Sequence, residues 1–270
     1  MKRRELKKSK KPEWVITKEK ESKKESTTKI WLYGIHAVRD ALKNKSRTKC
    51  KLMITPNAYK KMEDVILESS ITAEVIDPRK FFPPLEKSTV HQGVALEVNP
   101  LNWGSLFEVC TPPPKNLVLL LDRITDPQNV GAILRSAEVF GTTAVITPTR
   151  YSAPETGALA KTASGALERQ PYLRVPNLAR AIAGLKQMGY LCVGLDGSSS
   201  IDIVKGFREI PKVPIALVVG AEGPGLRELT LKSCDKVFKI PSFGNFGSLN
   251  VSNAAALALY ITRNHLDDEY

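Results

Sequence analysis

The sequence predicts an α/β protein built from two units, and three observations support this fold class. From Asn116 onward, solid apolar stretches of strand length alternate with segments of helical periodicity, a pattern typical of a covered parallel sheet. Residues 30–99 alternate shorter strand-like and helical stretches, which indicates a smaller α/β unit. With 270 residues, 42% of them hydrophobic, the chain is long enough for one large domain or two small ones.

The smaller unit contains two predicted helices and three predicted strands. Apolar residues at helical spacing predict the helices, and short apolar runs predict the strands. The helices cover 34–42 and 58–69, and the strands cover 51–54, 73–76 and 93–98.

A linker is predicted at 100–115. This segment carries Asn102, Gly104 and a triplet of prolines at 112–114. Such a composition favours extended or turn conformations and resists both helix and sheet. We therefore place the domain boundary here.

The larger unit, residues 116–270, contains five predicted strands with helices between them. The strands cover 117–121, 143–146, 190–194, 215–219 and 237–240. In open parallel sheets, ligands bind in the crevice beyond the carboxyl ends of the strands. Three motifs follow directly after such strands, so we expect a binding site at this edge.

The formal net charge of +12 indicates an anionic partner. Residues 1–29 hold 12 Lys or Arg against 5 Glu, a net charge of +7. Because this tail has few apolar residues to offset the entropy cost of ordering, we expect it to be disordered and to bind nucleic-acid phosphates through counterion release. A tail that only solubilises the protein is the alternative.

Several classes of protein are not indicated. The tail has neither the apolar core of a secretory signal nor the Arg-rich, acid-poor composition of a transit peptide. No apolar run is long enough to cross a bilayer, so we expect a cytoplasmic protein without membrane contact. Four cysteines and three histidines are scattered without a CxxC pair, so neither a metal site nor a disulfide framework is predicted.

The first motif, 126–135, enters a helix after the first strand of the larger unit. The apolar residues of this helix form one stripe, and Asn129 and Arg135 lie outside it. In one interpretation Asp126 or Asn129 caps the helix, and Arg135 pairs with Glu138 on the surface. In the other, Asn129 and Arg135 face the crevice, where the donor fork of an arginine suits RNA phosphate.

The second motif, 220–225, is a glycine-rich loop. Glycines permit positive φ and close approach of the backbone to a ligand, but the spacing matches neither a Walker loop nor the GxGxxG dinucleotide fingerprint. A plain strand-to-helix turn is the alternative. Glu222 favours a functional loop, because a carboxylate among exposed amides is positioned to pair with Arg135 or another cationic group.

The third motif runs from Ile240 through 248–252 into a predicted helix over 254–262. Asn250 or Ser252 could be no more than the N-cap of that helix. The alanines that follow let another backbone come close, which suits either a dense helix contact or a knotted chain.

In this order and spacing, the three motifs resemble the signature of the SpoU (TrmH-type) RNA 2'-O-methyltransferases of the SPOUT superfamily, over most of 117–263. The resemblance implies an α/β fold with a deep trefoil knot, S-adenosylmethionine as cofactor, and homodimers. It implies catalytic roles for Asn129, Arg135, Glu222 and Asn250. It implies cofactor contacts at Gly220, Ile240, Ser248, Leu249 and Asn250.

In the implied reaction, the ribose 2'-hydroxyl attacks the sulfonium methyl in line. Arg135 would contact the ribose and phosphate and assist deprotonation of the 2'-hydroxyl. Glu222 or a phosphate would tune Arg135 for this role. A free arginine is almost always protonated, which counts against the role of base. The chain departs from the family at Ser242-Phe243, where Met usually follows Ile-Pro, but backbone contacts to the cofactor are expected to survive.

The smaller unit has a resemblance of its own. Residues 33–38 and 91–95 resemble the L30e-like substrate-binding domain of one branch, which modifies a guanosine of large-subunit ribosomal RNA. This implies ribosomal RNA as the partner. A tRNA 2'-O-methyltransferase is one alternative, although that branch lacks the small domain. A non-catalytic RNA-binding protein of the same fold is another.

Overall fold

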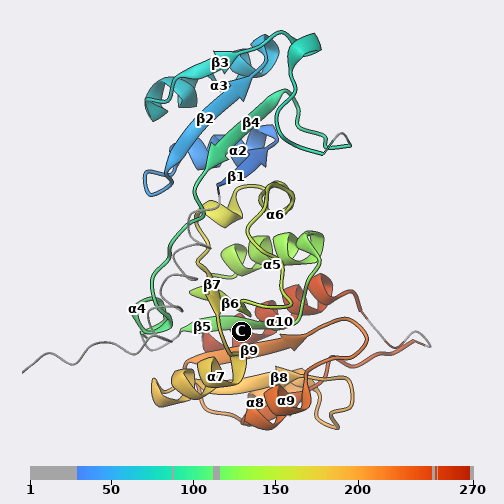
Figure 1. Cartoon of the computed structure of the whole chain (residues 1–270). Helices are drawn as coiled ribbons and strands as arrows, with labels where there is room; N and C mark the ends of the chain where they lie inside the picture. Colours follow the sequence, from blue (N-terminus) through green and yellow to red (C-terminus); the bar gives the residue numbers. More distant parts are fainter. Residues whose placement is uncertain (1–28, 87, 112–115, 245–246, 248, 268–270) are drawn as a thin grey trace, which may run out of the picture.

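Two α/β units follow one another along the chain (Figure 1). The structure is a computed structural model that describes residues 29–86, 88–111, 116–244, 247 and 249–267. Apart from Lys29, the basic tail lies outside the described residues, as does the proline triplet at 112–114.

The N-terminal unit contains a four-stranded sheet in the order β1-β4-β2-β3. Its elements are β1 (Ile30–Tyr33), α2 (Ile35–Lys43), β2 (Lys49–Ile54), α3 (Pro56–Ser69), β3 (Ala73–Val75), the 3-10 turn η1 (Pro78–Lys80) and β4 (Val94–Val98). β4 pairs antiparallel with β1 and β2, and β2 pairs parallel with β3. The five predicted elements are present, and β1 was not predicted.

The segment between the units contains a short helix, α4 (Leu106–Cys110). Ser105 caps this helix and forms a capping box with Glu108, a local signal that starts a helix. Cys110 is fully buried among core residues of the larger unit. The prediction that 100–115 resists helix is therefore wrong at α4, because the capping box and this burial outweigh the composition of the segment.

The C-terminal unit is a six-stranded parallel sheet in the order β10-β8-β9-β5-β6-β7. Its strands are β5 (Leu117–Asp122), β6 (Ala144–Pro148), β7 (Tyr172–Val175), β8 (Leu191–Leu195), β9 (Ile215–Gly220) and β10 (Lys236–Phe238). Its helices are α5 (Pro127–Val139), α6 (Gly157–Ala163), the 3-10 turn η2 (Ala166–Glu168), α7 (Leu178–Gln187), α8 (Ile203–Arg208), α9 (Glu228–Ser233) and α10 (Val251–Leu266). The five predicted strands are present, and the edge strand β7 was not predicted.

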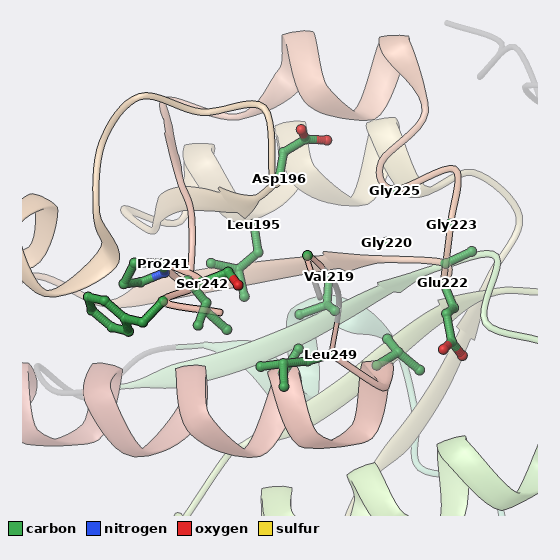
Figure 2. A pocket seen from close by; sticks show the side chains of 17 residues that line it. Leu195, Asp196, Val219, Gly220, Glu222, Gly223, Gly225, Pro241, Ser242 and Leu249 are labelled. Carbon is green, nitrogen blue, oxygen red and sulfur yellow. The ribbon is translucent and has the colours of Figure 1, made fainter. Parts of the chain in front are cut away.

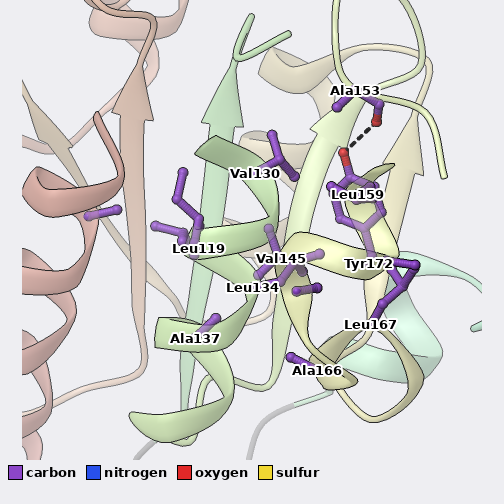
Figure 3. Close-up of a cluster of buried hydrophobic side chains, with 14 of the residues drawn as sticks. Leu119, Val130, Leu134, Ala137, Val145, Ala153, Leu159, Ala166, Leu167 and Tyr172 are labelled. Atoms are coloured by element: carbon purple, nitrogen blue, oxygen red, sulfur yellow. Dashed lines mark hydrogen bonds between the residues drawn. The ribbon is translucent and has the colours of Figure 1, made fainter. Parts of the chain in front are cut away.

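Helices cover both faces of this sheet, because successive residues of a strand point to opposite faces. In β5, Leu117, Leu119 and Leu121 belong to the core that α5 and α10 complete, whereas Val118 and Leu120 belong to the core that α7 completes. Figure 3 shows the α5 side of this core around Leu119. Both faces of the sheet are thus covered beneath the loops that leave its carboxyl edge.

A buried ion cluster joins the two units. Arg47, in the loop after α2, has a fully buried side chain, and Glu155 and Glu168 belong to the larger unit. The guanidinium donates to Glu168 through Nε (3.0 Å) and Nη2 (2.6 Å), to Glu155, and to the carbonyl of Asn99 (2.9 Å). Burial raises the pKa of Glu155, and Arg47 opposes this rise. Close by, a Cβ at Gly157 would overlap the backbone of β1, so α6 packs directly against the smaller unit.

Candidate functional site

A cavity of about 490 Å³ opens at the carboxyl ends of β8, β9 and β10 (Figure 2). These strands are parallel neighbours, so their loops leave the same edge of the sheet. The cavity is lined by 195–197 after β8, by 219–223 and 225 around the end of β9, by 240–243, 247 and 249 after β10, and by 251 and 254 of α10. Four predicted site residues lie in its wall, namely Gly220, Glu222, Ile240 and Leu249.

The loop after β9 turns back tightly on itself. A Cβ at Gly220 would overlap the backbone of Gly225, and the amide of Gly225 donates to the carbonyl of Ala221 over 3.0 Å. Gly223 and Gly225 have φ values of 85° and 67°, which favour glycine. The bare backbone of this turn forms one wall of the cavity.

The loop after β10 brings apolar side chains to the cavity. Ile240 is half-buried, whereas Leu249 is 50% and Phe243 is 97% exposed. The residues that follow Ile-Pro, where the family resemblance led us to expect methionine, are Ser242 and Phe243, and both lie in the cavity wall. Ser248, a predicted cofactor contact, lies outside the described residues.

The wall is acidic, in contrast to the chain as a whole. Asp196 and Glu222 are its charged residues, and the described part of the chain contributes no Lys, Arg or His to it. Figure 2 shows the two carboxylates projecting in different directions around Gly220. Asp196 accepts from the amide (2.9 Å) and hydroxyl (2.6 Å) of Ser198. A cleft lined by one sign of charge concentrates ligands of the opposite sign, so this cavity favours a cationic ligand.

Asp196 is a candidate that the motif search missed. It belongs to none of the three motifs. Its signal was its position two residues after the predicted strand 190–194, where ligand-binding residues gather in parallel sheets.

Asn129 and Asn250 meet beside the cavity. The Nδ2 of Asn250 donates to the Oδ1 of Asn129 over 2.9 Å, across 121 residues of chain. Asn250 also caps α10, because its Oδ1 accepts from the amide of Ser252 over 2.9 Å. Asp126, and not Asn129, caps α5, which leaves the Asn129 side chain for this contact. The prediction that Asn250 caps the last helix is therefore confirmed, and its amide nitrogen is used in the contact with Asn129.

Arg135 lies apart from these residues within one chain. It is exposed, six residues after Asn129 on α5, which corresponds to about 9 Å along the helix axis. The expected surface pair with Glu138 is wrong, because Glu138 binds Arg169 instead. In the described part of the chain, no ion pair joins Arg135 to Glu222 either. The structure thus brings Asn129, Asn250 and the cavity together, and leaves Arg135 outside.

No group of three or more His, Cys, Asp or Glu among the described residues is arranged to hold a metal ion. Among the same residues, every helix is too short or too polar to cross a membrane.

Comparisons with known families cover both units. A sequence model of the SpoU rRNA Methylase family matches residues 116–260. A second, described as RNA 2'-O ribose methyltransferase substrate binding, matches residues 31–104.

Curated relatives extend over most of the chain. The 23S rRNA (guanosine-2'-O-)-methyltransferase RlmB of Vibrio vulnificus is 37% identical over 244 residues, which cover 85% of this chain and 94% of that protein. The protein of the same name from Pseudomonas putida is 36% identical over 239 residues, with the same coverage of 85% and 94%.

Solved structures share the fold. The SpoU methyltransferase AviRb of Streptomyces viridochromogenes, solved in complex with AdoMet, matches with a TM-score of 0.74 at 22% identity and covers 87% of this chain and 90% of its own. The AdoMet-bound rRNA methyltransferase of Sinorhizobium meliloti matches with a TM-score of 0.71 at 21% identity, covering 93% and 92%. At these identities the likeness establishes the fold alone.

Proposed function

The chain belongs to the SpoU rRNA methylase family, and from this membership we propose that it is an S-adenosylmethionine-dependent RNA 2'-O-methyltransferase. The methyl acceptor is the ribose 2'-hydroxyl of a guanosine in large-subunit ribosomal RNA. Similarity through both units to relatives named for that activity supports this substrate. The observation that carries the proposal is the acidic cavity that the second and third motifs build at the carboxyl edge of the sheet.

The cavity fits S-adenosylmethionine in charge and in shape. The cofactor carries a positive sulfonium and a positive amino group, and when bound it supplies an electrophilic methyl group. Asp196 and Glu222 give the wall the opposite sign of charge. The bare backbone at Gly220 allows close approach, and Ile240 and Leu249 add apolar surface. Backbone groups at these three positions are the proposed cofactor contacts, with Ser248 as a further one.

Asn129 and Asn250 are proposed to position the ribose. Their joined amides lie where the N-termini of α5 and α10 meet, and an amide can both donate to and accept from a hydroxyl. In-line attack demands that the hydroxyl be held in a fixed direction. The Asn129–Asn250 pair supplies hydrogen-bonding groups next to the cavity that can hold the hydroxyl in this way. Glu222 lies on the loop after β9.

We propose a homodimer in which Arg135 of one protomer acts at the cavity of its partner. Within one chain Arg135 is remote from the cavity, yet it shares a face of α5 with Val139, four residues on, which is 77% exposed. On α10, Leu257 and Tyr260 are 41% and 49% exposed. Exposed apolar residues on packed helices are typical of a contact surface, and a second copy of this chain would cover them.

The remaining assignments extend the family resemblance. Residues 30–99 form the L30e-like substrate-binding domain, 100–115 the linker, and 116–270 the methyltransferase domain with its trefoil knot. The tail at 1–29 adds contacts to RNA phosphate. The enzyme acts on ribosomal RNA in the cytoplasm.

The activity is tested by methyl transfer from labelled S-adenosylmethionine to unmodified total RNA, separated into ribosomal and transfer fractions. We expect label in large-subunit RNA that disappears with Arg135→Ala. Arg135→Lys asks whether the guanidinium is needed, because near-normal turnover would remove an arginine-specific role. Label in tRNA would overturn the ribosomal substrate. No label in any fraction, with cofactor and RNA binding intact, would favour a non-catalytic binding protein.

A mixed dimer tests whether Arg135 acts across the interface. Arg135→Ala and Gly220→Ala chains are coexpressed with different tags, and the heterodimer is purified. If Arg135 serves the partner, one of the two sites combines an intact cavity with an intact arginine, and activity returns. If Arg135 serves its own chain, both sites are defective and the heterodimer is as inactive as either parent.

A further inference from the structure

A second cavity, of about 230 Å³, opens at the carboxyl ends of β5, β6 and β7. It shares the sheet edge with the cofactor cavity, but the two have no lining residue in common. We call it the arginine cleft, after Arg123, Arg150 and Arg227 in its wall. Tyr151, Leu229 and the start of α7 complete it.

The charge of the arginine cleft is positive and only partly compensated. Its described lining contains three arginines and no Asp or Glu. Arg227 is held by the buried carboxylate of Asp122, with 2.7 Å between Nε and Oδ1. Within the described residues, no ion pair or hydrogen bond of a carboxylate reaches Arg123 or Arg150. Two uncompensated guanidinium groups at one cleft favour a phosphate ligand.

Two side chains of the cleft come from residues with an unusual backbone conformation. Arg123 and Tyr151 both have a φ of 60°, which is uncommon for residues other than glycine. The Cζ of Arg123 lies 4.9 Å from the centre of the Tyr151 ring, and yet Tyr151 is 67% exposed. Burial does not explain this arrangement. Residues held in such regions gather at binding and catalytic sites.

We propose that the arginine cleft binds a nucleotide of the substrate RNA that flanks the modified one, with its base stacked on Tyr151 and its phosphate held by Arg123 and Arg150. The cleft is smaller than the 300 Å³ or more of typical small-molecule sites, so it fits one unit of a polymer. Exposed aromatic rings beside arginines are the usual platform for unpaired RNA bases.

The position of the cleft agrees with this role. β5 is the hydrogen-bonded neighbour of β9, whose loop carries Gly220. The ends of β5 and β6 are therefore one or two strand spacings from the cofactor cavity, or about 5–10 Å. This separation suits consecutive nucleotides of one strand. The inference rests on the proposed function, because it assigns a second subsite to the same substrate.

The test measures the affinity for a labelled, mixed-sequence single-stranded oligoribonucleotide by fluorescence anisotropy over a salt series, and the KM for unmodified large-subunit RNA. Tyr151→Ala is expected to weaken RNA binding by about 5- to 150-fold, the range for loss of one stacked base. Tyr151→Phe, which keeps the ring, should recover most of this loss. RNA affinity falls as salt rises, so log affinity plotted against log salt has a negative slope. Arg150→Ala should make this slope less steep by about 0.7, the value for one phosphate contact to a single strand.

Arg180→Ala is the matched control, because Arg180 is an exposed arginine on α7 outside the cleft. Tyr151→Asn guards against misfolding, since asparagine tolerates positive φ. It should lower RNA affinity without lowering the thermal unfolding midpoint or the affinity for S-adenosylmethionine. If the enzyme methylates RNA but the cleft variants bind RNA as Arg180→Ala does, the role of the cleft is refuted and the proposed function is not. A wild-type protein that transfers no methyl group, but whose RNA binding falls with Tyr151→Ala, would overturn the proposed function and leave the cleft standing.

Discussion

Replacing Arg47 with methionine tests how firmly the small domain is fixed to the methyltransferase unit. Arg47 has a fully buried side chain and holds two carboxylates, those of Glu155 and Glu168, whose side chains are 11% and 3% exposed. Methionine keeps much of the aliphatic volume but removes every hydrogen bond of the guanidinium. The variant would leave two buried carboxylates facing each other without a cation.

The size of the effect follows from burial. Removing one partner of a buried ion pair costs about 3–5 kcal/mol, because the remaining charge stays uncompensated. Arg39→Met is the control, since the Arg39–Asp64 pair is exposed, with 27% and 62% of the side chains accessible. Pairs of that kind contribute at most about 1 kcal/mol. The two substitutions make the same chemical change within one domain. The difference between their losses in stability therefore gives the contribution of the buried ion cluster at the interface.

The pH dependence has a definite sign. Burial already raises the pKa of Glu155 above its ordinary value of 4.5, with Arg47 opposing. Without Arg47, the carboxyl group of Glu155 binds a proton more tightly in the folded protein than in the unfolded chain. The variant therefore gains relative stability as the pH falls, and loses it as the pH rises through the folded pKa. We expect the deficit of Arg47→Met to be large at neutral pH and smaller in acid.

The assay combines urea unfolding at several pH values with hydrogen exchange of α6 and β1, which meet at the interface. If the small domain detaches before either unit unfolds, faster exchange in these elements reports it directly. A stability loss within 1 kcal/mol of that of Arg39→Met at neutral pH, together with unchanged exchange in α6 and β1, would refute the reasoning.

Three further outcomes are expected. Gly220→Ala should abolish binding of S-adenosylmethionine in calorimetry, because a methyl group there overlaps the backbone of Gly225; binding at wild-type affinity would contradict the tight turn. Asn250→Ala should lower the free energy of unfolding by about 0.5–2 kcal/mol through loss of the α10 cap, and should also slow methyl transfer; a change in stability alone would argue against its role at the ribose. Glu155→Gln should destabilise less than Glu168→Gln in urea unfolding at neutral pH, since Glu168 accepts two guanidinium bonds and burial already disfavours the charge of Glu155; the reverse order would contradict this division of roles.

The strands of both sheets show what local pattern can and cannot predict. Strands such as β5 and β9 are continuous apolar runs, because they are buried on both faces, and such runs stand out in the sequence. β1 and β7 lie at sheet edges and contain exposed or half-buried residues. β1, Ile-Trp-Leu-Tyr, is itself a short apolar run that the prediction overlooked, whereas the exposed Arg174 interrupts the apolar pattern of β7. α4 was different, because Ser105 and Glu108 carry a capping-box signal that the proline-rich context obscured.

The site was predictable to the extent that sheet geometry is general. Loops that follow the strands of one parallel sheet leave the same edge, so the shared edge of 220–225 and 240–244 could be predicted from the buried-strand pattern. The position of β8 between β9 and β10 could not be predicted from the order along the chain. The separation of Arg135 from Asn129 was also readable, since six residues on a helix place two side chains on different faces. The Arg47 cluster was not, because its partners lie 108 and 121 residues away and no local pattern marks them.

The segment between β6 and α6 connects the domain interface with the arginine cleft, and its anchoring decides whether the two act independently. Tyr151 lies in the cleft and Glu155 binds Arg47, four residues further on. Between them Ala153 is fully buried; its amide donates to the carbonyl of Ile124 (3.3 Å), and its carbonyl accepts from the hydroxyl of Tyr172 (2.7 Å; Figure 3).

Because Ala153 is fixed on both sides, movement of Glu155 after loss of Arg47 should stop there and leave Tyr151 in place. Arg47→Met should then keep wild-type affinity for a short oligoribonucleotide that reaches only the cleft. Its KM for large-subunit RNA should rise, since that substrate must contact both domains in a fixed orientation. Equal losses for the two RNAs would mean that the interface sets the cleft itself, and that the Ala153 anchor does not isolate it.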